Sequence, residues 1–341
     1  MHDPAPLEES VVLSPEWLTH VLGAPVRAVE VVERLETVAT KVRFRVDFDD
    51  ASDGRVDAFC VKAYFNPEMR SRVAAGEPEA RFYLELAPTL PIRVPPCVYA
   101  AIDPDTGHAL VLMEDLVAQG ATFLTALSPY SVDQAKGTLQ QLARLHAEHW
   151  DDPGLSTHPF LAPRLPSFLQ YVDAERLQSQ LDGPRGDDLP AEVKDAVRLR
   201  AALLAIAERD AAGPQVLVHG DTHAGNLYEL PGGAPGIIDW QVVQLGSWAL
   251  DVAYHLGAVL DVDARREHER ALLDHYLACL AAAGAPAPTS DDAWFEYRAH
   301  LAYGYFMWAI TQMVDPPIIV TFTRRLGLAV ADHDSFGLLG V

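Results

Sequence analysis

The spacing of hydrophobic and polar residues divides the chain into two unequal parts. In the first part, apolar residues alternate with charged ones, most clearly at Val42, Phe44, Val46 and Phe48. Alternation with a period of two is typical of a strand with one buried face. We therefore expect an antiparallel sheet with one inserted helix at 78–86. Its strands should lie at 26–32, 42–48, 56–65, 91–101 and 108–113.

Helical periodicity takes over after Glu114-Asp115-Leu116. The segment Ser131-Val-Asp-Gln134 has the pattern of a capping box, and an apolar stripe of helical spacing follows it as far as Trp150. The fold class is thus α+β, with a small sheet-rich lobe at 1–115 and a larger, mostly helical lobe at 116–341. Further helices are expected at 191–211, 249–260, 265–283 and 294–313, and from about 319.

Composition and charge exclude several classes of protein. The net charge of −22 argues against nucleic-acid binding, because Lys and Arg patches hold phosphate backbones. No apolar run reaches the roughly 18 residues that a membrane span needs, and the acidic N-terminus lacks the apolar core of a signal peptide. Cys60, Cys97 and Cys279 are widely spaced, which favours reduced thiols over a zinc site or disulfides. We expect a cytoplasmic monomer or homodimer that binds neither nucleic acid nor membrane.

Two short apolar runs in the second part of the chain each end in an acid. The run from Val216 leads to Asp221, with Asn226 shortly after it, and the run from Gly236 leads to Asp239. Neighbouring strands would bring the polar groups at their ends together. A general base beside a divalent cation suits phosphate chemistry, so these residues are the first candidates for a catalytic site.

The segment from His219 to His223 permits three interpretations. As alternate strand residues, His219, Asp221 and His223 would share one face and could bind zinc. The Gly-Asp-Thr-His sequence is also similar to a motif of dinuclear metallophosphatases. Neither interpretation finds its remaining ligands elsewhere in the chain. The third is the pattern of a kinase catalytic loop, with Asp221 as the base and Asn226 as a metal ligand.

The kinase interpretation makes demands that the rest of the sequence meets. A lysine should lie within an N-terminal strand, as Lys62 does. A glutamate from the inserted helix should hold that lysine, and Glu79 is well placed, with Glu77 as its competitor. A strand should leave the sheet into a hinge, here at 114–117. A metal-binding acid should follow the catalytic loop, as Asp239 does.

These motifs resemble those of the aminoglycoside phosphotransferase and choline kinase-like superfamily, which shares the bilobal protein-kinase fold. The residues HGDTHAGNL at 219–227 match the family's HGDxHxGN(L/I) loop, and GIIDWQ at 236–241 matches its (V/I)IDW(E/Q) segment. The segments at 142–150 and 114–116 are similar to the branch that contains ecdysteroid kinase-like enzymes. The resemblance covers roughly residues 25 to 315.

The resemblance implies ATP-dependent transfer of the γ-phosphoryl group to a hydroxyl of a small molecule. Asp221 would orient and deprotonate that hydroxyl. Asn226 and Asp239 would hold Mg²⁺, and Lys62 would bind the nucleotide phosphates with Glu79 as its partner. The catalytic loop at 219–226 and these partners would lie in the cleft between the lobes.

The nucleotide, ATP or alternatively GTP, would contact the hinge backbone near Glu114 and Leu116. The loop from Arg34 to Lys41 should cover its phosphates, with Thr37, Thr40 or Lys41 as a contact. This loop has no glycine, where the family often has one. Because a loop without glycine approaches phosphates less easily, a catalytically weak, nucleotide-binding pseudokinase is the second hypothesis. The third is a metallohydrolase.

The supporting residues and the size of the acceptor follow from the same resemblance. His219 and His223 should support the catalytic loop, and Asp251 should brace it. Only a short segment separates Asp239 from Asp251, which leaves no room for the peptide-docking platform of a protein kinase. The acceptor should therefore be a small molecule.

The acceptor pocket is expected beside the helix at 294–313. Its aromatic stripe is typical of a protein core, but an exposed part of it would form a pocket from Trp294, Tyr305 and Trp308. An aromatic pocket suits a hydrophobic or quaternary-ammonium alcohol better than a polyamino sugar. Acceptors similar to aminoglycosides, choline or hydrophobic alcohols are all compatible with the sequence.

Overall fold

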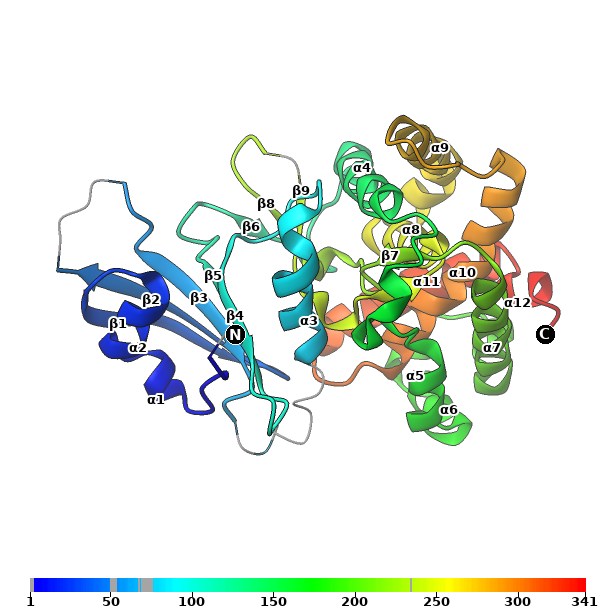
Figure 1. Ribbon diagram of the computed structural model, residues 1–341. Helices are drawn as coiled ribbons and strands as arrows, with labels where there is room; N and C mark the ends of the chain where they lie inside the picture. The colour runs from blue at the N-terminus through cyan, green and yellow to red at the C-terminus, as the bar shows by residue number, and fades with distance from the viewer. Residues whose placement is uncertain (1–2, 50–53, 67, 69–75, 234) are drawn as a thin grey trace.

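The computed structural model describes residues 3–49, 54–66, 68, 76–233 and 235–341, and these form two lobes (Figure 1). The smaller lobe contains a five-stranded antiparallel sheet in the order β1-β2-β3-β5-β4. The larger lobe is mostly helical, so the predicted α+β class is confirmed. The strands of the sheet are β1 (Val26–Glu36), β2 (Thr40–Phe48), β3 (Ala58–Ala63), β4 (Cys97–Ile102) and β5 (Ala109–Glu114).

One face of the sheet is covered by the N-terminal helices α1 (Glu9–Val12) and α2 (Pro15–Leu22). Phe44 of β2 and Val61 of β3 are buried there in one apolar cluster with Leu18 of α2. Since successive side chains of a strand point to opposite faces, the residues between these apolar positions face the other way. The alternation in the sequence thus places the apolar side chains against α1 and α2 and the residues between them on the side of the larger lobe.

The second face of the sheet carries cationic side chains. Lys41 of β2 lies opposite Lys62 of β3 in the strand register, and Arg43 lies opposite Cys60. All four line a cavity between the lobes. The sheet therefore presents positive charge to the cleft and an apolar surface to α1 and α2.

The inserted helix lies between the sheet and the larger lobe (Figure 1). It comprises α3 (Glu77–Arg81) and a π-helical turn at Phe82–Leu86. Phe82 stacks on Trp240 of the larger lobe, with ring centroids 3.8 Å apart and planes 7° from parallel. The backbone N–H of Trp240 donates to Glu79 Oε1 (3.3 Å). This contact joins the inserted helix to the segment that carries the predicted metal-binding acid.

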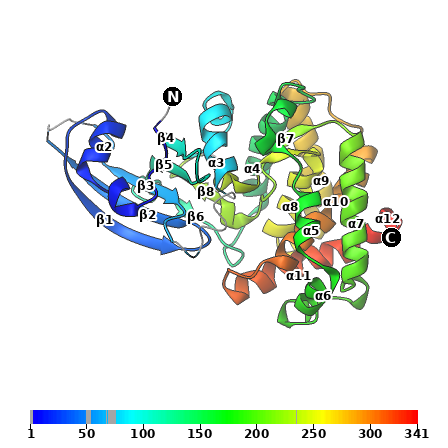
Figure 2. The ribbon, with the colours of Figure 1, turned by 60° about the horizontal axis from the view of Figure 1, so that its bottom comes forward.

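The larger lobe is built around α8 (Trp248–Val259), whose residues are all buried. A helix that is apolar on every side is typical of the centre of a domain. Its neighbours include α10, whose contact with α8 is extensive, and α4 and α11 (Figures 1 and 2). The other helices of this lobe are α4 (Val132–Glu148), α5 (Leu165–Tyr171), α6 (Ala174–Leu181), α7 (Ala196–Ala212), α9 (Val262–Ala282), α10 (Ser290–Ile310), α11 (Pro316–Asp332) and α12 (Ser335–Leu338).

Short strands at the cleft side of this lobe hold the catalytic segments. β10 pairs with β7, and β8 pairs with both β6 and β9, each pair antiparallel. Asp221 and Asn226 lie in the connection from β7 to β8, and Asp239 follows β9. These strands are β6 (Thr122–Phe123), β7 (Val216–Val218), β8 (Leu227–Glu229), β9 (Pro235–Ile237) and β10 (Gln244–Gly246).

One predicted strand starts later than the sequence pattern suggested. The strand expected at 91–101 begins at Cys97. Pro91, Pro95 and Pro96 have no N–H to donate to a neighbouring strand, which keeps the preceding segment out of the sheet. Among the described residues, no helix has the length and apolar character that crossing a membrane requires.

We predict that Trp240→Ala lowers the free energy of unfolding by about 3–5 kcal/mol, because a fully buried ring and its stack on Phe82 are lost. Urea denaturation of the full chain measures this value. Tyr171→Ala is the control, since that ring is 77% exposed and its loss should change the free energy by at most about 0.5 kcal/mol. Equal effects of the two substitutions would contradict the structural role given to the Phe82–Trp240 contact.

Candidate active site

Asp251, in the first turn of α8, accepts hydrogen bonds from the backbone of the predicted catalytic loop. Its carboxylate accepts the backbone N–H of His219 (2.7 Å) and of Gly220 (2.8 Å) through different oxygens. Its own carbonyl accepts the hydroxyl of Thr222 (2.8 Å), and His146 Nε2 lies 3.2 Å from the carboxylate. Asp251 is fully buried. A loop without regular pairing needs such partners for its buried N–H groups, so Asp251 fixes its shape.

Gly220 occupies a position that only glycine fits easily. Its φ is 81°, a value that L-residues with a side chain rarely adopt. A Cβ there would lie 2.7 Å from the carbonyl oxygen of Val242. The carbonyl of Gly220 accepts the hydroxyl of Tyr303 from α10 (2.7 Å). The sharp turn before Asp221 is therefore packed from both sides.

His219 has both ring nitrogens engaged by the backbone. Nδ1 accepts the N–H of Asp221 (3.1 Å), so Nε2 carries the proton and donates to the carbonyl of Ile238 (2.9 Å). The ring also packs edge-on against Trp240. No nitrogen of His219 remains for a metal, and no group of three or more His, Cys, Asp or Glu among the described residues is placed to hold one. The zinc interpretation of this segment is therefore wrong.

Asp221 is partly buried, with 24% of its side chain exposed, and its two carboxylate oxygens have different partners. Oδ1 accepts the hydroxyl of Tyr254 (2.8 Å), and Oδ2 accepts the side-chain N–H of Asn226 (3.0 Å). His223 Nε2 lies 3.5 Å from Oδ2. Burial alone would raise the pKa of Asp221, but His223 and these hydrogen bonds outweigh it and lower the pKa below the ordinary value. The carboxylate is thus kept ionised and held in one orientation.

Tyr254 was missed in the sequence analysis. It lies one helical turn after Asp251 on α8. Residues three apart on a helix are near neighbours, so the same helix braces the loop through Asp251 and contacts the Asp221 carboxylate through Tyr254. The only sequence signal was this spacing within an otherwise apolar helix.

Lys62 is the centre of an ion cluster that joins three segments. Its Nζ lies 2.6 Å from Glu79 Oε2 and 2.9 Å from Asp239 Oδ1, and the lysine is 5% exposed. Burial by itself would lower the pKa of Lys62, but the two carboxylates more than offset it and raise the pKa. Glu77, the competing candidate, binds Arg81 instead (2.7 Å). The structure thus places Glu79 beside the lysine.

Asp239 adopts a left-handed backbone conformation, with φ of 66°. Few residues other than glycine do so, and here the turn aims the carboxylate at the sheet. Burial would raise the pKa of Asp239, but Lys62 and Lys41 hold it well below its ordinary value. Lys41 Nζ lies 3.9 Å from Oδ2. Two lysines of adjacent strands therefore face this one carboxylate.

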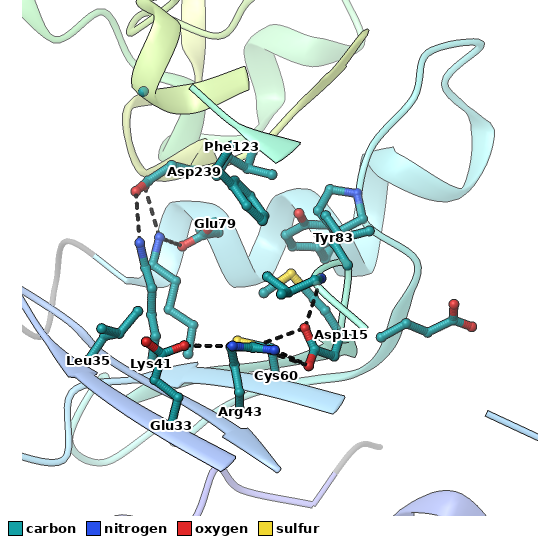
Figure 3. Close-up of a pocket in the computed structure, with 18 residues that line it drawn as sticks. Glu33, Leu35, Lys41, Arg43, Cys60, Glu79, Tyr83, Asp115, Phe123 and Asp239 are labelled. Carbon is teal, nitrogen blue, oxygen red and sulfur yellow. Dashed lines mark hydrogen bonds and ion pairs between the residues drawn. The ribbon is translucent and has the colours of Figure 1, made fainter. Parts of the chain in front are cut away.

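A cavity of about 400 Å³ extends from this ion cluster to the hinge (Figure 3). Glu114 and Leu116 of the predicted hinge line it, together with apolar side chains such as Phe123. Arg43 lies on the far side of the cavity. Its Nε and Nη2 donate to the two carboxylate oxygens of Asp115 in the hinge, at 3.0–3.1 Å. We call this space the hinge cavity. The ion cluster lies at one end, and at the hinge end apolar side chains lie beside the Arg43–Asp115 pair.

Thr40 does not line the hinge cavity, contrary to its predicted role. It is buried on the face of the sheet that packs on α1 and α2, because it shares the strand parity of Val42 and Phe44. Its neighbour Lys41 takes the position toward the cleft. Of the three candidates in this loop, Lys41 and Thr37 line the space between the lobes and Thr40 does not.

A second cavity of about 340 Å³ lies on the other side of the catalytic residues. It shares Lys41, Lys62, Gly225 and Asp239 with the hinge cavity, so the two meet at the ion cluster. We call its remaining part the acceptor pocket. The acceptor pocket is lined by Thr37, Val38, Ala39, Thr125, Asp221, His223, Asn226, Gln241, Tyr254, Met307, Trp308, Thr311, Met313, Val314, Ile318 and Phe322.

Of the three aromatic residues predicted for this pocket, the structure places Trp308 in its wall but not Trp294 or Tyr305. Trp294 and Trp308 are separated by about two thirds of the length of α10, roughly 20 Å at 1.5 Å per residue. Tyr305 is fully buried, and its hydroxyl donates to the carbonyl of Val193 (3.0 Å). The stripe is therefore mostly core, and only its C-terminal end reaches the cavity.

Comparison with known proteins gives a family and a set of similar folds. A family model described as "Phosphotransferase enzyme family" matches residues 43–293. Among curated proteins, none matches the sequence significantly. The choline kinase LicA from Streptococcus pneumoniae has a TM-score of 0.50 at 15% identity, over 96% of this chain and 99% of that one.

Two further solved structures are similar over most of both chains. The macrolide 2'-phosphotransferase MphH from Brachybacterium faecium is 18% identical, with a TM-score of 0.50 over 93% of this chain and 98% of that one. An ethanolamine kinase from Plasmodium vivax is 12% identical, with a TM-score of 0.53 over 88% and 81%. At these identities the likeness concerns the fold, and it confirms the predicted bilobal, kinase-like architecture.

We predict that Asp251→Asn lowers the free energy of unfolding by about 1–3 kcal/mol, because an amide leaves one buried loop N–H without an acceptor. Amide hydrogen exchange at His219 and Gly220 should become faster. Asp261→Asn is the matched control: Asp261 caps α9 through the N–H of Ala264, and Asn caps a helix equally well. Unchanged exchange at both loop amides in Asp251→Asn would show that Asp251 does not brace the loop.

Proposed function

The chain belongs to the phosphotransferase enzyme family, and from this premise we propose that it transfers the γ-phosphoryl group of ATP to a hydroxyl of a small molecule. One observation carries the proposal. Asp221, Asn226, Asp239 and Lys62 come from separate segments of both lobes and line one continuous space. This is the set of groups that phosphoryl transfer needs for the base, the cation and the phosphates.

The nucleotide would lie in the hinge cavity. Its base would lie among the apolar side chains of the hinge end and hydrogen-bond the backbone near Glu114 and Leu116, and its phosphates would reach Lys62 and Lys41. Both lysines line the hinge cavity and the acceptor pocket alike. The γ-phosphoryl group would thus sit where the two spaces meet. The loop from Arg34 to Lys41 has no glycine to bring its backbone close to the phosphates, and the positive charge of Lys41 and Lys62 would attract the phosphates instead.

The residues present also fit Mg²⁺. The side-chain N–H of Asn226 is used by Asp221, so its amide oxygen is the atom that remains for a cation. With the carboxylate of Asp239 it provides the hard oxygen donors that Mg²⁺ prefers. When bound, Mg²⁺ would neutralise charge on the phosphate oxygens.

Asp221 would act on the acceptor hydroxyl. As the alcohol oxygen bonds to the γ-phosphorus, the bond from that phosphorus to the oxygen of ADP breaks, and the hydroxyl proton passes to the Asp221 carboxylate. The lowered pKa of Asp221 makes it a weak base, which suits a loose transition state in which orientation matters more than early proton removal. Tyr254 and Asn226 supply that orientation through their hydrogen bonds to the carboxylate.

We predict that Asp221→Asn lowers kcat by about 10²–10⁴-fold, the usual contribution of a general base, while the Kd for Mg·ATP changes little. An assay of ADP formation with a panel of alcohols measures kcat, and calorimetry measures the Kd. Asp263→Asn is the control, because that side chain is exposed on the first turn of α9.

The outcomes separate the competing functions. Nucleotide binding without phosphorylation of any acceptor would contradict the proposal and favour a pseudokinase. Release of phosphate from simple esters without ATP would favour a metallohydrolase. Phosphorylation that Asp221→Asn leaves unchanged would contradict the role of Asp221 while leaving the overall reaction in place.

A further inference from the structure

The acceptor pocket has an uneven distribution of charge. The charged side chains that line the whole cavity are Lys41, Lys62, Asp221 and Asp239, and all four belong to the catalytic end. Lys62 and Lys41 both face Asp239. Beyond Asp221, the described residues of the wall are uncharged apart from the ionisable ring of His223. Among the described residues of the wall, the second carboxylate is that of Asp239, which Lys62 and Lys41 already face, so none is left to hold a cationic group of an acceptor away from Asp221.

The aromatic rings of the wall are packed against one another. The centroid of Trp308 lies 4.3 Å from that of Phe322 and 5.0 Å from that of His223, and His223 lies 5.2 Å from Phe322. Rings in such direct contact leave no space between them for an ammonium group. They form a continuous wall. A cage for a cation would instead need several ring faces that surround one space.

The charge behind this wall is positive. Arg185 donates from one nitrogen to the carbonyls of Trp308 (2.9 Å), Ala309 and Thr311 (both 2.8 Å) at the end of α10. Trp308 and Thr311 themselves line the pocket. This half-buried guanidinium occupies the carbonyls that would otherwise attract a cation. Asp315, the acid that follows in the chain, is exposed and does not line the pocket.

The outer end of the pocket is apolar and adaptable. Met307 and Ile318 line it, and Met313 and Val314 form its rim, where they are 51% and 37% exposed. Methionine side chains adjust their shape to apolar ligands. Exposed apolar residues beside a cavity mark a place where an apolar body can be buried.

We propose that the acceptor is a neutral alcohol with a bulky apolar body, and that the pocket rejects polyamino sugars and quaternary-ammonium alcohols. The hydroxyl would lie at Asp221 and the body against Trp308, Phe322 and the rim. Burying a cation against Trp308, Phe322 and the rim would cost free energy that no carboxylate among the described residues of that part of the wall offsets. This inference rests on the proposed function, since it assumes that the pocket beside Asp221 receives the acceptor.

A matched pair of alcohols tests charge at constant shape. Choline is compared with its neutral carbon isostere, in which a tert-butyl group replaces the trimethylammonium group. A second pair has a benzyl group in place of one methyl group. Binding to the full chain is measured by calorimetry in the presence of Mg²⁺ and ADP. We expect the neutral member of each pair to bind at least about tenfold more tightly, and the neutral benzyl compound to bind best.

Two substitutions test whether the preference for the neutral alcohol arises in the acceptor pocket. Val314→Asp adds a carboxylate at the rim and should reduce or reverse the preference for the neutral member. Val197→Asp is the control, because Val197 is 68% exposed on α7 and lies outside the residues that line the pocket; it should leave the preference unchanged. A Val314→Asp variant with the wild-type preference would overturn the inference.

The remaining outcomes also decide the matter. Equal or tighter binding of the cationic members, or of kanamycin, would overturn the inference even if ATP-dependent phosphorylation is observed. Failure of every compound to bind would overturn it as well. Tight binding of the neutral alcohols without their phosphorylation by Mg·ATP would support the inference about the pocket and contradict the proposed function instead.

Discussion

The arrangement of the cleft depends on one buried ammonium group. Lys62 is contacted by Glu79 from the inserted helix and by Asp239 from the segment after β9. A buried charge is tolerated only when it is paired, and loss of one partner typically costs about 3–5 kcal/mol. The sheet, the inserted helix and the larger lobe must therefore keep their relative positions for Lys62 to contact both carboxylates. The same requirement brings Lys62 and Asp239, the predicted metal ligand, to one place.

Hydrogen bonds from the core of the larger lobe impose a second constraint. The catalytic loop has little regular structure of its own, yet Asp251 from α8 and Tyr303 from α10 satisfy its backbone groups. Tyr254 extends the same scaffold to the side chain of Asp221. The carboxylate is thus oriented by helices whose position is fixed by packing, which is how a rigid scaffold makes a loop precise enough for chemistry.

The order of motifs predicted the fold class and the family, because the kinase-like pattern depends on residues at fixed places in the chain. Position within an element was harder to predict. Thr40 and Lys41 are adjacent, and a strand register alone decides which one faces the cleft. Trp294 and Trp308 share a stripe, but about two thirds of the length of α10 separates them. Long-range partners such as Tyr254 have no sequence signal beyond helical spacing.

The central proposal is that nucleotide phosphates bind between Lys62, Asp239 and Asp221. The most direct measurement is a crystal structure of the chain with Mg²⁺ and a non-hydrolysable ATP analogue. We expect the base against the hinge backbone at Glu114 to Leu116, the phosphates in contact with Lys62, and the γ-phosphoryl group facing Asp221. A nucleotide bound elsewhere, or one whose phosphates point away from Lys62 and Asp239, would contradict it.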